Sequence, residues 1–242
     1  MPSFYHVPAH NADGERQHVF IAVPVVGGFP AKFAASLWDY ARGFERVGMA
    51  ADLCVLSGDC HVDDARNSLV RRFLTSEADT FIFIDSDVTT HVSNLIRLAK
   101  YDRDVVAGLY PYKSDEGGFP VLPMGSHVAP EPDGLVEVES VPTGFLKIRR
   151  HVLEDLAKKA PKFYGKAESR EIGKPIPKIF GRTHVSWDEQ PAHDGGEWWQ
   201  SGTFGDEVGG DYWFCRQWKA TGGKIYADPN YMMTHIGEKE WS

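Results

Sequence analysis

The sequence lacks several features that would place a protein in a large class. No apolar stretch is long enough to span a bilayer, and residues 1–18 contain no apolar core of the kind found in signal peptides. Only three cysteines are present, Cys54, Cys60 and Cys215, and their spacing matches no zinc motif. We therefore expect a protein without a disulfide framework or a membrane span, working in the reducing cytoplasm.

An excess of basic residues is also missing. The chain has 26 Lys and Arg against 34 Asp and Glu, a formal net charge of -8. Such a surface does not attract nucleic-acid phosphate overall, so a nucleic acid acceptor is possible but not favoured. The first apolar run is followed by "VPVVGGFP", which is not a Gly-x-Gly-x-x-Gly fingerprint, so NAD is not expected either.

Strand and helix patterns alternate over the first half of the chain. Short apolar runs at 18–26, 51–58, 79–87 and 104–113 predict strands, and segments at 31–48, 63–78 and 91–102 have helical spacing. We expect Asp63 or Asp64 to be the N-cap of the second helix. This alternation is typical of an α/β fold with a mainly parallel sheet and helices on both faces, which binds ligands beyond the carboxyl ends of its strands.

The second half is less regular. Residues 135–160 predict two strands and a helix, residues 209–223 a helix closed by glycines, and residues 224–237 two short strands. The stretch 161–208 is rich in Gly, Pro, Lys and aromatics, and we interpret it as a functional loop or small insertion. We predict a single domain over residues 1–242, with a nucleotide-binding half at 18–113 and an acceptor-side half at 114–242.

Two acids end the most apolar predicted strand. In "FIFIDSDVTTH", Asp85 and Asp87 are separated only by Ser86, and no basic residue adjoins them in the sequence. A divalent cation such as Mn²⁺ or Mg²⁺ binds through one or two carboxylates, with phosphate and water completing its ligands. We therefore predict that a cation binds here, while a solvated turn remains the alternative.

Five segments in order resemble the GT-A-fold, nucleotide-sugar-dependent glycosyltransferases of the Asp-x-Asp, family-2-like type. They are "DDARNSLVRRFL", "FIFIDSDV", "VVAGLYPYK", "VPTGFLKIRRHVLEDL" and "GGDYWFCRQWKATGGKIYADPNYMMTHIG", within about residues 18–237. The resemblance implies a Rossmann-like GT-A sheet that binds a nucleoside-diphosphate-sugar and a metal ion.

The resemblance also implies roles for individual residues. Asp87 would bind the metal directly, Asp85 would bind it through water or hold the ribose, and His235 would add an imidazole, a mixed set that suits Mn²⁺. Arg66, placed in the first turn of its helix, is a candidate for phosphate binding or for pairing with Asp85. The remaining candidates for nucleotide binding are Pro24, Val25 and Ser86.

Asp211 is the candidate general base. The resembled enzymes open this helix with a Glu-Asp pair, whereas this chain reads Gly209-Gly210-Asp211, so the Glu is missing. Asp211 could equally be a helix N-cap. Asp206 and Glu207 are reserve candidates for the base, and the aromatic side chains of Trp198 and Trp199 could stack on a sugar ring or simply pack.

These features favour a metal-dependent glycosyltransferase of the hexosyltransferase type. It would move a sugar from a UDP- or GDP-linked donor to a hydroxyl of a glycan, a small molecule or a modified macromolecule. One alternative is a nucleotidyltransferase acting on a sugar phosphate, although the loop after the first strand has one Lys and no Arg. Another is a non-catalytic nucleotide-sugar-binding protein.

Overall fold

The computed structural model describes most of the chain. The described residues are 3–8, 17–28, 30–59, 61–125, 129–164, 174–186, 205–231, 233–237 and 240–241, with the backbone alone at 183–186, 205–207 and 240–241.

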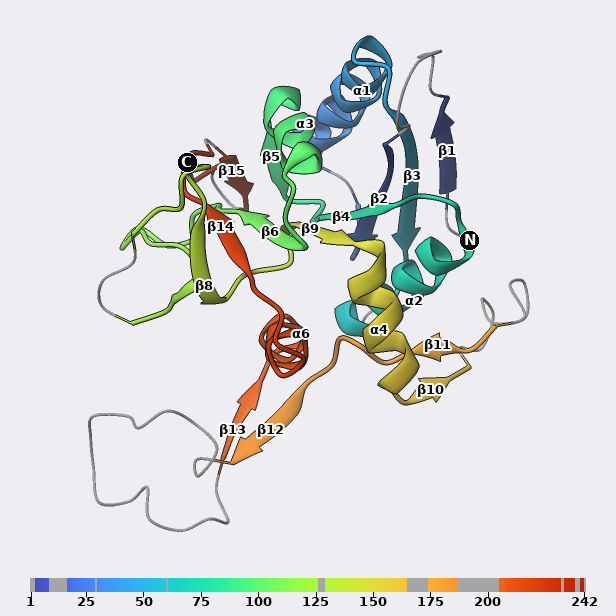
Figure 1. Cartoon of the computed structure of the whole chain (residues 1–242). Coiled ribbons are helices and arrows are strands. Elements are labelled where there is room, and N and C mark those ends of the chain that lie inside the picture. The colour runs from blue at the N-terminus through green and yellow to red at the C-terminus, as the bar shows by residue number, and fades with distance from the viewer. Residues whose placement is uncertain are drawn as a thin grey trace.

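The described residues form strands and helices that alternate along much of the chain (Figure 1). The helices are α1 (Ala31–Arg46), α2 (Val62–Thr75), α3 (Val92–Lys100), α4 (Arg150–Lys159) and α6 (Gly210–Lys219). The strands are β1 (Ser3–Val7), β2 (His18–Val25), β3 (Ala50–Ser57), β4 (Thr80–Ile84), β5 (Val88–Thr90), β6 (Val105–Gly108), β7 (Leu122–Pro123), β8 (Val136–Ser140), β9 (Phe145–Arg149), β10 (Lys162–Phe163), β11 (Ile176–Pro177), β12 (Thr183–Ser186), β13 (Gly205–Val208), β14 (Tyr226–Asp228), β15 (Met233–Ile236) and β16 (Glu240–Trp241).

A nine-stranded sheet in the order β1-β3-β2-β4-β9-β6-β14-β8-β7 runs through the molecule. Strands β3, β2 and β4 are parallel neighbours, as are β6 and β14, and β9 lies between β4 and β6 and is antiparallel to both. All five of those parallel strands therefore point the same way. Since β9 and β14 come from the second half of the chain, both halves share one sheet.

Helices cover both faces of this sheet. On one face α2, α4 and α6 pack against Phe81 and Phe83, and on the other α1 and α3 pack against Ile82 and Ile84. Strand β4 is buried along its whole length, which explains why it is a continuous apolar run rather than an alternating one. The α/β class, with most strands in one direction and helices on both faces, is confirmed.

Two local expectations were wrong. The N-terminal segment before residue 18, where no strand was predicted, contains β1, which pairs antiparallel with β3 at the edge of the sheet. Helix α2 has His61 at its N-cap position, with no side-chain cap. Asp63 and Asp64 lie instead in its first turn, where their charge still favours the helix dipole, and Arg66 lies one turn later.

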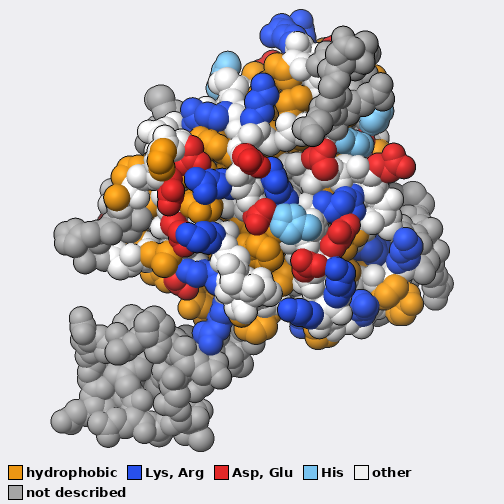
Figure 2. Space-filling view, viewed as in Figure 1, with side chains coloured by type: hydrophobic (Ala, Val, Ile, Leu, Met, Phe, Trp, Pro, Cys, Tyr) orange, Lys and Arg blue, Asp and Glu red, His pale blue; other side chains and the backbone are white. Residues whose placement is uncertain are grey.

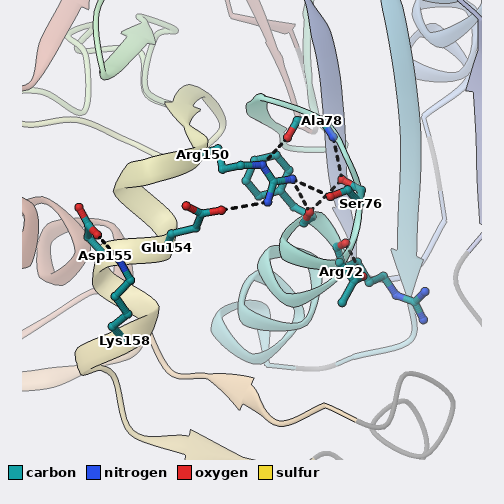
Figure 3. A network of polar contacts seen from close by, with 9 residues as sticks. Arg72, Ser76, Ala78, Arg150, Glu154, Asp155 and Lys158 are labelled. Atoms are coloured by element: carbon teal, nitrogen blue, oxygen red, sulfur yellow. Dashed lines mark hydrogen bonds and ion pairs between the residues drawn. The ribbon is translucent and has the colours of Figure 1, made fainter.

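The orientation of α2 is fixed at its far end by Arg150, the first residue of α4 (Figure 3). Its guanidinium donates hydrogen bonds to the carbonyl oxygens of Phe73, Ser76 and Ala78 at 2.6–3.1 Å, and lies 4.4 Å from the centre of the Phe73 ring. A positive charge on the last carbonyls of a helix satisfies acceptors that have no partner inside the helix. This contact ties α2 to α4.

The described surface on the view of Figure 2 carries acidic and basic side chains in small alternating groups, without a broad patch of one sign. No helix in the described part of the chain is both long enough and apolar enough to cross a membrane.

Candidate functional site

Asp85 and Asp87 lie in the turn directly after β4. The amide of Asp85 donates to the carbonyl oxygen of Gly144 at 2.9 Å, and the carbonyl oxygen of Asp85 accepts from the amide of Val88 at 3.0 Å. The chain then starts β5 at Val88. Both acids are therefore held at the carboxyl edge of the parallel strands, as the sequence predicted.

Strand pairing brings His235 to the same turn. Strand β15 pairs antiparallel with β5, which places His235 opposite Val88, and the amide of Ile236 donates to the carbonyl oxygen of Asp87 at 2.7 Å. The Nε2 atom of His235 lies 3.6 Å from Asp87 Oδ2. Residues nearly 150 positions apart thus meet because of two short strands.

The segment after β6 orients the imidazole of His235. Its Nδ1 atom lies 2.9 Å from the carbonyl oxygen of Pro111, which can only accept, so Nδ1 carries a proton and Nε2 faces Asp87. The ring of Tyr110 packs edge-on against the imidazole, with ring centres 5.0 Å apart. Histidines that bind metals are commonly oriented by such a contact to a carbonyl.

Lys113, from the same segment, supplies a positive charge. Its Nζ donates to Asp87 Oδ2 at 2.6 Å. Partial burial raises the pKa of Asp87, but His235 and Lys113 outweigh it and lower the pKa to about 2. Asp87 is therefore ionised at every pH at which the protein would work, and the position beside its carboxylate suits a cation.

Asp85 has a different partner. Its carboxylate accepts from the guanidinium of Arg66 at 3.3 and 3.4 Å, and burial raises its pKa while Arg66 acts to lower it. Arg66 is nearly buried, and it also lies 3.7 Å from Asp63. The expected pairing of Arg66 with Asp85 is present. Each of the two acids therefore has a basic side chain beside it, Arg66 for Asp85 and Lys113 for Asp87, that does not adjoin it in the sequence.

Asp211 lies close to this group. The preceding Gly210 packs so tightly on Asp63 that a Cβ atom at position 210 would fall 2.2 Å from Asp63 Oδ1. The negative charge of Asp211 acts to raise the pKa of both Asp63 and Tyr110. The helix N-cap is Gly209, and the Asp211 carboxylate accepts from the amide of Tyr212 at 2.8 Å, so Asp211 does not occupy the N-cap position.

The predicted metal ligands form a pair rather than a closed trio. Among the described residues, His6, His18 and Asp52 form the one group of three or more His, Cys, Asp or Glu whose ligand atoms all lie within 4.8 Å of one another. Asp85, Asp87 and His235 are thus more widely spread. The oxygen and nitrogen donors of Asp87 and His235 fit a divalent cation, and Asp85, held by Arg66, fits a contact through water or to a ribose.

The other predicted nucleotide contacts lie at the same sheet edge. Pro24 and Val25 end β2, next to β4, and both side chains are buried, so their backbone would have to make any contact with a ligand. Ser86 is part-buried in the turn between the two acids. Trp198 and Trp199 lie outside the described residues, and so do the side chains of Asp206 and Glu207.

Sequence reasoning missed the roles of three residues here. Lys113 and Tyr110 both fall in "YPYK", directly after a predicted strand, a position that points to the same sheet edge as Asp85. Asp63 was considered only as a helix cap. The position after a strand could have indicated the first two, but no signal in the sequence places Asp63 beside Gly210.

Comparisons with known proteins support the fold and go no further. No protein-family model matches the chain, and no curated protein matches its sequence significantly. The crystal structure of A197 from STIV is similar, with a TM-score of 0.52 and 18% identity over 92% of this chain and 86% of that one. A glycosyltransferase involved in the glycosylation of the major capsid of PBCV-1 aligns with a TM-score of 0.33 and 13% identity, over 57% of this chain and 62% of that one. The first likeness shows a shared fold, and the second is too distant to carry an argument.

Proposed function

We propose that this protein is a metal-dependent glycosyltransferase of the GT-A, Asp-x-Asp type. It transfers a sugar from a UDP- or GDP-linked donor to a hydroxyl group of an acceptor. The observation that carries the proposal is the meeting of Asp87, His235 and Lys113 at the carboxyl edge of a Rossmann-like sheet, with Arg66 on Asp85 beside them. This edge is where such sheets bind nucleotides.

The donor set fits a Mn²⁺ or Mg²⁺ ion bound by Asp87 and His235. Such an ion, when bound, neutralises the diphosphate and makes it a better leaving group. Lys113 and Arg66 are positioned to pair with phosphate oxygens, since a nucleoside diphosphate brings negative charge to two basic groups whose ion pairs, in the described part of the chain, are with carboxylates. Asp85 would then be free to hold the ribose or a water molecule on the ion.

Asp211 is the proposed general base. In an inverting transfer, its carboxylate would take the proton from the acceptor hydroxyl as that oxygen attacks the sugar carbon and the diphosphate leaves. The tight contact of Gly210 with Asp63 holds this end of α6 against α2, and so keeps Asp211 near Asp63 and its neighbour Arg66. The proposed base thus comes from the second half of the chain, as does His235, whereas the metal ligand Asp87 comes from the first half.

The proposal is tested by incubating the protein with a panel of UDP- and GDP-sugars and Mn²⁺, and measuring the nucleoside diphosphate released. We expect release from one donor in wild-type protein and none in the Asp87→Ala variant. Release of pyrophosphate from a nucleoside triphosphate and a sugar phosphate would instead show a nucleotidyltransferase. Tight donor binding without turnover, across donors and acceptors, would show a binding protein and refute the enzymatic proposal.

A further inference from the structure

A second group of side chains that could hold a metal ion lies at the opposite edge of the sheet, near the start of β2 and β3. His6 on β1, Asp52 on β3 and His18 on β2 come from three neighbouring strands, in the order in which the strands lie in the sheet. His6 is directly opposite Asp52 in the register, and Asp52 is opposite Phe20, two residues from His18. Because side chains alternate between faces, this register places all three on the same face.

The contacts within this group converge on one carboxylate. Asp52 is 4% exposed, and its two oxygens contact one histidine each, Oδ1 with His6 Nδ1 at 2.7 Å and Oδ2 with His18 Nε2 at 2.9 Å. The Nε2 atom of His18 is shielded from solvent, and among the described residues it has no partner with the geometry of a hydrogen bond. The contact between His18 and Asp52 is short but lacks hydrogen-bond geometry. A metal ion bound by both side chains would account for it better than a shared proton.

We propose that His6, His18 and Asp52 bind one divalent transition-metal ion of the zinc type. Two imidazole nitrogens and a carboxylate form a donor set that Zn²⁺ commonly accepts, with bonds of roughly 2.0–2.2 Å. All the ligand atoms already lie within 4.8 Å of one another, so only small shifts would let them surround an ion. The half-exposed His6 leaves one side open, so a water molecule completes the coordination.

The site would fasten β1 to the sheet. Strand β1 pairs only with β3 among the described strands, and four of its five residues are exposed, so little apolar burial holds it in place. An ion bound by β1, β3 and β2 would link three neighbouring strands of the sheet. The role is structural and does not depend on the proposed transfer reaction.

The first test measures bound Zn²⁺ after equilibrium dialysis. It uses an Asp87→Ala background, which removes the other proposed metal site at Asp87 and His235. We expect about one ion per chain, lost in His6→Ala and in His18→Ala and retained in His151→Ala. His151 is a matched control, because it is about as exposed as His6 and also faces one aspartate, Asp104, at 3.3 Å. Zinc bound equally by all variants, or by none, would overturn the proposal.

A second test does not depend on stoichiometry. Amide hydrogen exchange of residues 3–7 is followed with Zn²⁺ and with EDTA. We expect zinc to slow exchange in this strand in wild-type protein and not in the Asp52→Asn variant, whose smaller change preserves the shape of the side chain. Circular dichroism shows that each variant is folded. Equal exchange with zinc and with EDTA would show that a plain His-Asp-His contact holds β1 and that no metal is involved.

Discussion

At the scale of single residues, the state of the candidate site depends on which positive group contacts the Asp87 carboxylate. In the structure that cation is the ammonium group of Lys113, at 2.6 Å. A metal ion that binds Asp87 must displace it, and the freed lysine can then pair with a phosphate oxygen. Lys113 would therefore compete with the metal before the donor binds and assist the donor afterwards.

This exchange predicts opposite effects of Lys113→Met on two ligands. Both partners of the ion pair are about one third exposed, and pairs of this kind are worth about 0–1 kcal/mol. We expect Mn²⁺ to bind up to about fivefold more tightly without nucleotide, and UDP or GDP to bind more weakly with Mn²⁺. Isothermal titration measures both. Lys158→Met, which breaks a similar lysine-aspartate contact on α4, is the control, and equal affinities in both variants would refute the exchange.

Asp211 can be tested separately from the metal. If it is the general base, Asp211→Asn should lower kcat by about 10²–10⁴-fold. Donor affinity should be unchanged, because the proposed donor contacts come from Arg66, Asp87 and Lys113. Steady-state kinetics with titrations of the donor checks both. A kcat close to that of the wild type would mean that another group takes the proton, or that the transfer retains configuration and needs no base there.

At the scale of elements, the sequence predicted the central strands and helices well and the edges poorly. Strand β4 and helix α1 have strong apolar patterns and were found close to where they were expected. Strands β1 and β5 were not predicted, because they are short and their position depends on pairing partners far away in the sequence, whereas β15 falls within the stretch where two short strands were expected. The apolar pattern of β9 likewise gave no sign that it lies antiparallel between β4 and β6.

The same reasoning explains which part of the site was visible in the sequence. Asp85 and Asp87 follow an unbroken apolar run, so their place at the sheet edge could be inferred from the strand alone. Lys113 reaches Asp87 only because β4 and β6 end at the same edge of the sheet, separated by the single strand β9. Contacts of this kind come from the order of strands in the sheet, which local patterns do not encode.

One element-level contact predicts a loss of stability. Gly144 lies just before β9, and a Cβ atom there would fall 2.5 Å from the hydroxyl oxygen of Tyr110 and 2.9 Å from Asp85 Oδ2. Gly144→Ala should therefore lower the free energy of unfolding by about 1–3 kcal/mol, as overpacking does. It should also weaken donor binding by displacing Asp85. Urea denaturation measures the first effect. Gly28→Ala, where a Cβ would meet nothing within 4 Å, is the control, and an equal loss in both variants would contradict the packing argument.

At the scale of the whole molecule, the two halves of the chain are joined through the central strand β9. That strand carries Lys147, which is 1% exposed and whose Nζ donates to the carbonyl oxygens of Tyr101 (3.1 Å) and Arg103. These carbonyls lie just after α3, so the lysine connects the centre of the sheet to the start of β6. Among the described residues it is one of very few buried charged groups.

We expect Lys147 to make the stability of the whole fold depend on pH. Burial lowers its pKa from an ordinary 10.5 to about 7. Between these values the unfolded chain binds a proton that the folded chain does not, so the free energy of unfolding rises with pH, by up to about 1.4 kcal/mol per unit. Below pH 7 both states are protonated and this contribution is flat. Lys147→Met should remove the rise between pH 7 and 9.5, as measured by urea denaturation across that range. The exposed Lys158→Met should keep it, and a Lys147→Met curve parallel to that of the wild type would show that the buried amine is not its source.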